Sequence, residues 1–92
     1  MKTLLVVYDI SEPRRLQRIA KLMMRYGVRA QKSVFECELG EARCREMAQK
    51  LADLIDEEAD QVRIYAVPSA VLEEQWVIGR EAAPLPDETV VV

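Results

Sequence analysis

The sequence predicts an α+β sandwich in which two helices cover one face of an antiparallel sheet. Two observations carry this prediction. Apolar, β-branched stretches at residues 3–9, 28–39 and 61–67 alternate with amphipathic helical patterns at residues 13–26 and 41–58. The elements therefore follow in the order strand, helix, strand, strand, helix, strand, with the middle stretch supplying two strands.

Residues 3–12 join the first strand to the first helix. The run up to Tyr8 is apolar without polar alternation, which predicts a strand buried on both faces. Ser11 is the predicted N-cap, and Pro13 lies in the first helical turn. Asp9 thus stands between a strand end and a helix start, where an aspartate is more often a turn or capping residue than a catalytic acid.

The first helix should end near Arg25 or Tyr26, at Gly27. Its core stripe has the spacing i, i+3, i+4, i+7 and consists of Leu16, Ile19, Ala20 and Met23. The opposite side carries a basic row made of Arg14, Arg18, Lys21 and Arg25. Such a row can be a plain solvated face. A solvated face usually mixes both signs of charge, so the single sign favours an anion-binding surface.

The middle of the chain forms either one long strand or a tight hairpin that turns near Lys32 and Ser33, and the hairpin is preferred. The second helix follows at residues 41–58, and a further strand at 61–67 ends at Pro68. The core stripe of the second helix is predicted to contain Cys44, Met47, Ala48, Leu51, Leu54 and Ile55. On the last strand Val62 and Ile64 should share one face, and Tyr65 and Val67 the other.

The C-terminal part gives a weaker pattern. Residues 75–78 could be a short strand, residues 81–88 read as an extended linker, and residues 89–92 are strand-prone. We predict a ferredoxin-like βαββαβ sandwich with an extra C-terminal β-strand. Residues 1–79 form the ferredoxin-like domain, and residues 80–92 form a linker and short strand that pairs with the partner subunit. A frayed tail is the alternative for residues 89–92.

The 92 residues predict a single domain, and a chain this short gains core by forming a dimer. No stretch is long and apolar enough for a membrane span, and the N-terminus does not read as a signal peptide, so a cytoplasmic protein is expected.

Cys37 and Cys44 have no metal-binding spacing and should be reduced, packed thiols. The absence of histidine excludes histidine-based catalysis and disfavours zinc.

The net charge of −3 conceals an asymmetry. Seven of the 13 basic residues lie between residues 14 and 32, and no acidic residue occurs from 13 to 35. Residues 36–60 carry nine acidic residues instead. An acidic protein with one basic face is therefore expected, and bulk charge alone would hide a nucleic-acid-binding surface.

Five pieces of the chain follow one another in a recognisable order over residues 3–67. They are Val7-Tyr8-Asp9-Ile10, Arg18, Tyr26-Gly27-Val28-Arg29, Gln31-Lys32-Ser33-Val34-Phe35-Glu36 and Val62-Arg63-Ile64-Tyr65. In these residues the chain resembles the CRISPR-associated protein 2 family, and the most specific parts are the Tyr-Asp-Ile and Gln-x-Ser-Val-Phe-Glu pieces.

The resemblance implies a ferredoxin-like homodimer that takes part in CRISPR spacer acquisition, bridges copies of the CRISPR integrase and holds incoming DNA. It also implies a metal-dependent nuclease acting on single-stranded RNA or double-stranded DNA. Asp9 would be its catalytic and metal-binding residue. Tyr8, Arg18, Arg29, Ser33 and Phe35 match positions around that site. Arg14 varies in the family and is a candidate nucleic-acid-binding residue from the basic row.

A single carboxylate is a poor site for Mg²⁺ unless waters and phosphates complete it. A two-fold dimer would place two Asp9 residues across one axis, with hydrated Mg²⁺, or Mn²⁺ as the alternative, between them. In this hypothesis Arg18 and Arg29 neutralise phosphates or stabilise the transition state, and Arg14 is a further nucleic-acid-binding residue. Two other functions stay open: a scaffold in which Asp9 has no catalytic role, and an RNA-recognition-like module, although Tyr8 and Phe35 alone are a meagre aromatic set.

Overall fold

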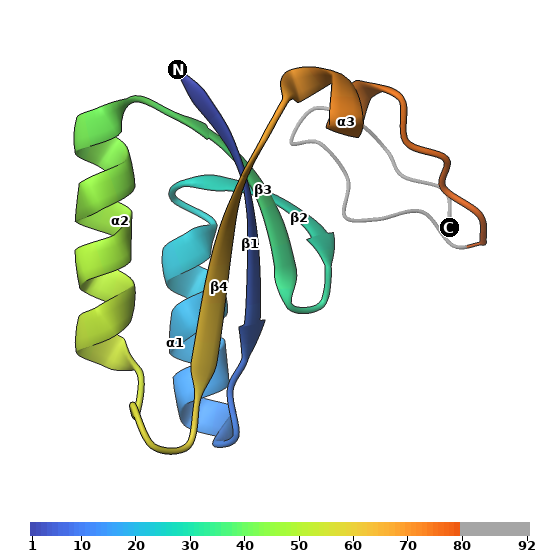
Figure 1. The fold of residues 1–92 in the computed structure, drawn as a ribbon. Coiled ribbons are helices and arrows are strands. Elements are labelled where there is room, and N and C mark those ends of the chain that lie inside the picture. Colours follow the sequence, from blue (N-terminus) through green and yellow to red (C-terminus); the bar gives the residue numbers. More distant parts are fainter. Residues whose placement is uncertain (80–92) are drawn as a thin grey trace.

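The structure of the protein is a computed structural model, in which residues 1–79 are described. Its elements are β1 (Lys2–Asp9), α1 (Pro13–Met23), β2 (Gly27–Gln31), β3 (Val34–Leu39), α2 (Glu41–Leu54), β4 (Gln61–Val67) and α3 (Ser69–Glu73). The four strands form one antiparallel sheet in the order β2-β3-β1-β4, and α1 and α2 lie against one of its faces (Figure 1). The predicted ferredoxin-like sandwich is confirmed. The predicted linker and terminal strand at residues 80–92 lie outside the described residues.

The two faces of the sheet differ in burial. On β1 the side chains of Leu4, Val6 and Tyr8 face the helices and are buried, whereas Leu5 and Val7 on the other face are half-buried. We call this second face the open face. The prediction that β1 is buried on both faces is therefore wrong for a single protomer, because α1 and α2 cover one face only (Figure 1).

The core lies between the helix layer and the inner face of β1 and β3. Both helices contribute as their periodicity predicts: Ile19 and Met23 of α1 and Met47 and Leu51 of α2 are buried. Phe35 of β3 is fully buried among them, which settles it as a core residue of the protomer. One residue predicted for the core stripe of α2, Ala48, is exposed. Val62 and Ile64 share the inner face as predicted, but Ile64 on the edge strand β4 is 41% exposed.

Three predicted helix boundaries change. Glu12, not Ser11, caps α1: its carboxylate accepts the backbone N–H groups of Arg14 at 3.1 Å and Arg15 at 2.8 Å. The first helix ends at Met23, before Gly27, and the second at Leu54, before the expected residue 58.

Gly27 is needed for a different reason from the predicted one. A Cβ at this position would lie 2.3 Å from the Glu36 carbonyl oxygen and 2.6 Å from Cys37 Sγ. Gly27 therefore permits the close approach of β2 to β3 rather than terminating a helix.

The hairpin prediction for residues 28–39 is confirmed, since β2 and β3 pair with a register shift between Arg29 and Gln31. The C-terminal prediction is wrong in part. Residues 75–78 form no strand, and the short helix α3 precedes them instead. This helix is tied to the sheet where the Ser69 and Thr3 hydroxyl groups lie 3.1 Å apart.

Candidate functional site

Asp9 is the last residue of β1, and Gln61 of β4 lies opposite it. Because side chains alternate along a strand, Asp9 belongs to the open face while its neighbour Tyr8 points into the helix-covered core. Asp9 is exposed, and within residues 1–79 no hydrogen bond or ion pair engages its carboxylate. It is thus neither a cap nor a turn-forming side chain, and its charge is available to a ligand.

Tyr8, Ser33 and Phe35 hold the strand end that carries Asp9. The Tyr8 backbone N–H donates to the Ser33 carbonyl at 3.0 Å, and its phenol donates to the Lys32 carbonyl at 3.3 Å. The rings of Tyr8 and Phe35 stack with centroids 6.2 Å apart. The structure therefore brings these three predicted site residues together beside Asp9, with the Tyr8 and Phe35 rings on the inner side of the sheet and Ser33 in the turn between β2 and β3.

Arg29 lies on that inner side too. Its guanidinium sits 5.3 Å from the centroid of the Phe35 ring, and its Nε is buried without a partner among the described residues. The register that pairs Arg29 with Phe35 places both on the helix-covered side, away from the open face of Asp9. Arg29 is therefore a packed cation near the strand end, not a neighbour of the Asp9 carboxylate.

The basic row on α1 is exposed along its whole length. Arg14, Arg18, Lys21 and Arg25 are exposed, and none of them forms an ion pair with a described residue. Three of them, with Gln17, line an open surface hollow of about 370 Å³. No hydrogen bond or ion pair within residues 1–79 joins the row to Asp9. The row is a separate basic surface on the helix layer.

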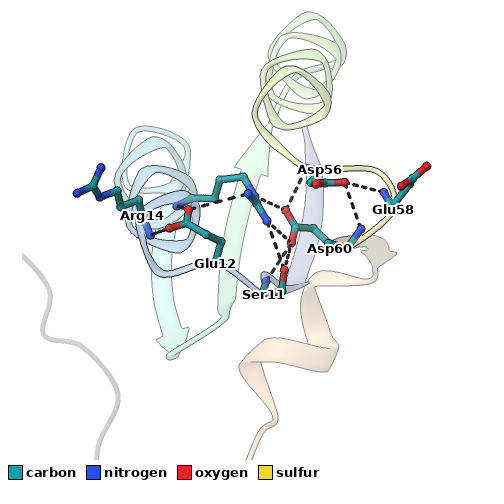
Figure 2. Close-up of polar contacts among 8 residues, drawn as sticks. Ser11, Glu12, Arg14, Asp56, Glu58 and Asp60 are labelled. Carbon is teal, nitrogen blue, oxygen red and sulfur yellow. Dashed lines mark hydrogen bonds and ion pairs between the residues drawn. The ribbon is translucent and has the colours of Figure 1, made fainter.

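A cluster around Asp60 stands next to the strand end and was not predicted from the sequence. The Asp60 side chain has no exposed surface and accepts five hydrogen bonds (Figure 2). The Ser11 N–H and hydroxyl donate at 2.9 and 3.1 Å, and the Asp56 N–H donates at 2.9 Å. Arg15 donates from Nε at 2.8 Å and from Nη2 at 3.3 Å. This cluster fixes the chain that follows Asp9.

The hydrogen bonds from Arg15, and then those from the Asp56 and Ser11 backbone, hold the pKa of the Asp60 carboxyl well below its usual range. Asp60 is therefore charged at neutral pH and cancels the charge of Arg15. The pKa of the Glu12 cap is lowered as well, chiefly by the backbone N–H groups of Arg15 and Arg14. Of the adjacent arginines, Arg15 is held by acids, whereas the Arg14 side chain forms no ion pair with a described residue.

The described residues offer a metal ion few ligands that lie close together. Within residues 1–79 no three carboxylate or thiol side chains come together closely enough to hold an ion. Asp9 nevertheless offers a free, exposed carboxylate, which fits a hydrated Mg²⁺ that takes its other ligands from water, phosphate or a second protomer. In the same part of the chain, no helix has the length and hydrophobicity needed to cross a membrane.

The family model described as "CRISPR associated protein Cas2" matches residues 1–75. The chain belongs to this family. A curated Cas2 relative from Chloroflexus aurantiacus, named CRISPR-associated endoribonuclease Cas2 1, is 44% identical over 81 residues, which are 87% of each chain. The resemblance found from the residues is thus confirmed.

Solved Cas2 structures share the fold. The crystal structure of Streptococcus pyogenes Cas2 at pH 6.5 has a TM-score of 0.77 and 33% identity, and the match covers 84% of this chain and 99% of that one. A chain in a partial Cas6-RT-Cas1–Cas2 complex has a TM-score of 0.73 and 26% identity, covering 85% of this chain and 91% of that one. These structures support the ferredoxin-like assignment made from the element order.

Two features of this Cas2 chain were missed by sequence reasoning for different reasons. In the sequence Asp60 is one of several acidic residues after the second helix. Only its hydrogen bonds with Ser11 and Arg15 in the folded protein distinguish it from the others. Arg63 lies in a segment that matches the family but was not predicted as a site residue. Its register opposite Val7, two residues from Asp9, could have been found by extending the strand pattern of β4.

Proposed function

We propose that this Cas2 chain acts in CRISPR adaptation as a cytoplasmic homodimer that binds nucleic acid together with the CRISPR integrase. The single observation that carries the proposal is the family match over residues 1–75. The similar chain in a Cas6-RT-Cas1–Cas2 complex supports an integrase partner, since Cas1 is named in that assembly.

The open face supports a dimer. It presents half-buried Leu5, Val7 and Val34, and its flanking Val28 and Tyr65 are 43% and 44% exposed. An antiparallel sheet with one uncovered apolar face gains stability by burying that face. A two-fold axis through it would bring the same face of two protomers together, and with it the two Asp9 strand ends.

The basic row supports nucleic-acid binding. Its four cations lack acidic partners within the described residues, so contact with phosphate would cost no existing ion pair. Phosphate contacts of this kind carry affinity but no sequence information. The row therefore fits a protein that holds nucleic acid irrespective of sequence.

We further propose that Asp9 serves a metal-dependent phosphodiesterase, acting on single-stranded RNA or double-stranded DNA, with one carboxylate from each protomer. A bound Mg²⁺ or Mn²⁺ would supply charge stabilisation and an activated water. Asp9 holds the ion, while the Tyr8 and Ser33 contacts keep its strand end in place. A free carboxylate on a rigid strand supports this role.

The alternative function is a scaffold with the same nucleic-acid surface and no catalysis at Asp9. Asp9→Ala separates the two, because the Asp9 carboxylate makes no hydrogen bond or ion pair within residues 1–79 whose loss would destabilise the protein. Cleavage of labelled single-stranded RNA and duplex DNA is measured with Mg²⁺, beside binding in EDTA. Loss of cleavage with unchanged binding supports the phosphodiesterase.

Unchanged cleavage by a highly purified Asp9→Ala protein would remove Asp9 as the catalyst and leave the scaffold. Asp53→Ala is the matched control, since Asp53 is exposed on α2 and accepts only from Gln49, at 3.1 Å, among the described residues. A spacer-acquisition assay in cells with both variants then tests whether cleavage matters for adaptation. If Asp9→Ala supports acquisition at the wild-type level, adaptation does not need the nuclease.

A further inference from the structure

Arg63 shares the open face with Asp9. β4 runs antiparallel to β1, with Gln61 opposite Asp9 and Arg63 opposite Val7. Residues directly opposite or diagonal to each other on one face of a sheet lie within reach of long side chains. Arg63 is therefore a diagonal neighbour of Asp9, and no layer separates them, because α1 and α2 cover the other face (Figure 1).

Two neutral side chains of β4 hold the Arg63 guanidinium. Its Nε donates to Gln61 Oε1 at 3.2 Å, and its Nη1 lies 3.5 Å from the Tyr65 hydroxyl. Gln61, Arg63 and Tyr65 alternate along the strand and so form one strip on the open face. Neutral partners orient a guanidinium without cancelling its charge.

In the single protomer Arg63 is exposed, and within residues 1–79 no acidic side chain forms an ion pair with it. Asp9 in turn forms no ion pair within the same residues. The arrangement keeps a free cation and a free carboxylate side by side. A ligand that carries both a metal ion and an anionic group would satisfy both, and a metal-bound phosphodiester is such a ligand.

We propose that Arg63 is the phosphate-binding residue of the Asp9 site, with Gln61 and Tyr65 as its positioning residues. The ligand is a phosphodiester of a nucleic-acid strand. This inference rests on the proposed nucleic-acid function and changes its residue assignment. Arg29 is packed on Phe35 on the inner side, and Arg18 belongs to the separate basic row, so neither shares a face with Asp9.

The test compares Arg63→Ala and Arg63→Lys with Arg45→Ala as the control, all in the full chain. Arg45 is an exposed arginine of α2, on the helix layer, whose partner is Glu41 at 3.6 Å. The probe is a fluorescent single-stranded oligoribonucleotide, titrated by anisotropy in EDTA and in Ca²⁺ at several salt concentrations. Cleavage is measured separately with Mg²⁺.

Arg63→Ala should weaken binding by on the order of tenfold and reduce the salt slope by about 0.7, the value for one single-strand phosphate. Arg63→Lys should lose part of the affinity, because it keeps the charge but not the planar fork. Tyr65→Phe should lose less than Arg63→Ala. Arg45→Ala should leave affinity and salt slope unchanged.

Unchanged affinity and salt slope in Arg63→Ala would overturn the inference. So would loss of the dimer in light scattering, because Arg63 would then be a subunit contact. The test of Arg63 can be distinguished from the test of the proposed phosphodiesterase. If no variant or wild type cleaves, the phosphodiesterase fails while weaker binding by Arg63→Ala still supports Arg63. If Asp9→Ala abolishes cleavage and Arg63→Ala changes neither binding nor cleavage, the phosphodiesterase is supported and the role of Arg63 is refuted.

Discussion

The Asp60 carboxylate accepts a hydrogen bond from Arg15 Nε at 2.8 Å, and no part of the Asp60 side chain is exposed. The same carboxylate accepts the backbone N–H groups of Ser11 and Asp56. One side chain therefore joins the turn after β1, the first turn of α1 and the turn before β4 (Figure 2). Such a buried charge is stable only while all its donors are present.

Asp60→Asn should destabilise the protein strongly. Both carboxylate oxygens face N–H donors, so whichever one becomes an amide NH₂ would oppose a donor and leave polar groups unsatisfied. We expect the thermal midpoint to fall by roughly 10 °C, measured by circular dichroism. Asp53→Asn should leave it nearly unchanged. A midpoint shift as small as that control would show that the cluster contributes little.

The same residue predicts how stability depends on pH. Because folding lowers the pKa of Asp60, its contribution is fully present above the unfolded-state pKa near 3.9. It is lost as the pH falls from there toward the lower folded-state pKa. Wild-type stability should therefore drop below about pH 4 more steeply than that of Asp60→Asn. Parallel curves for the two proteins in urea titrations from neutral to acidic pH would contradict this.

Arg14 and Arg15 should separate into a ligand-binding and a structural residue. The Arg14 side chain is exposed and forms no ion pair with a described residue, whereas Arg15 is held by Asp60 and Glu12. For duplex DNA, Arg14→Ala combined with Arg18→Ala should lower affinity and reduce the salt slope by about 0.9 for each phosphate that is no longer neutralised. Arg15→Ala should lower the thermal midpoint and leave the salt slope unchanged. Equal salt slopes for all proteins would make the row a plain solvated surface.

Gly27→Ala should cost about 1–3 kcal/mol of stability, because the added Cβ meets the Glu36 carbonyl, a backbone group that cannot move without shifting β3. Gly40→Ala is the control without steric conflict, since no atom lies within 4 Å of a Cβ there, and its own cost is the smaller one of replacing glycine at the N-cap of α2. Equilibrium denaturation in urea gives both values. If the two substitutions cost the same, the approach of β2 to β3 is looser than the structure indicates.

The residues that sequence could assign are those whose role is local. Ile19 and Met23 were predictable because a helical period decides their burial, and the hairpin at Lys32 and Ser33 was the preferred of two alternatives for the middle stretch. Ser11 is of a residue type that favours an N-cap, but its hydroxyl donates to Asp60, 49 residues away, and Glu12 caps α1 instead. Burial of Arg29 on Phe35 also depends on pairing between strands. The spacing of residue types along the chain does not identify interaction partners that lie far apart in the sequence.

The two thiols should react at different rates. Cys37 is almost fully buried in β3, and burial, with smaller effects from Cys44 and Glu36, raises its pKa to about 11. Cys44 is half-buried on α2, its thiol 3.8 Å from the Leu39 carbonyl. Because the thiolate is the nucleophile, iodoacetamide at pH 8 should modify Cys44 well before Cys37. Mass spectrometry of tryptic peptides over time measures both, and labelling in urea provides the fully reactive reference. Equal rates in the native protein would mean that the reagent reaches Cys37 on β3 as easily as Cys44 on α2.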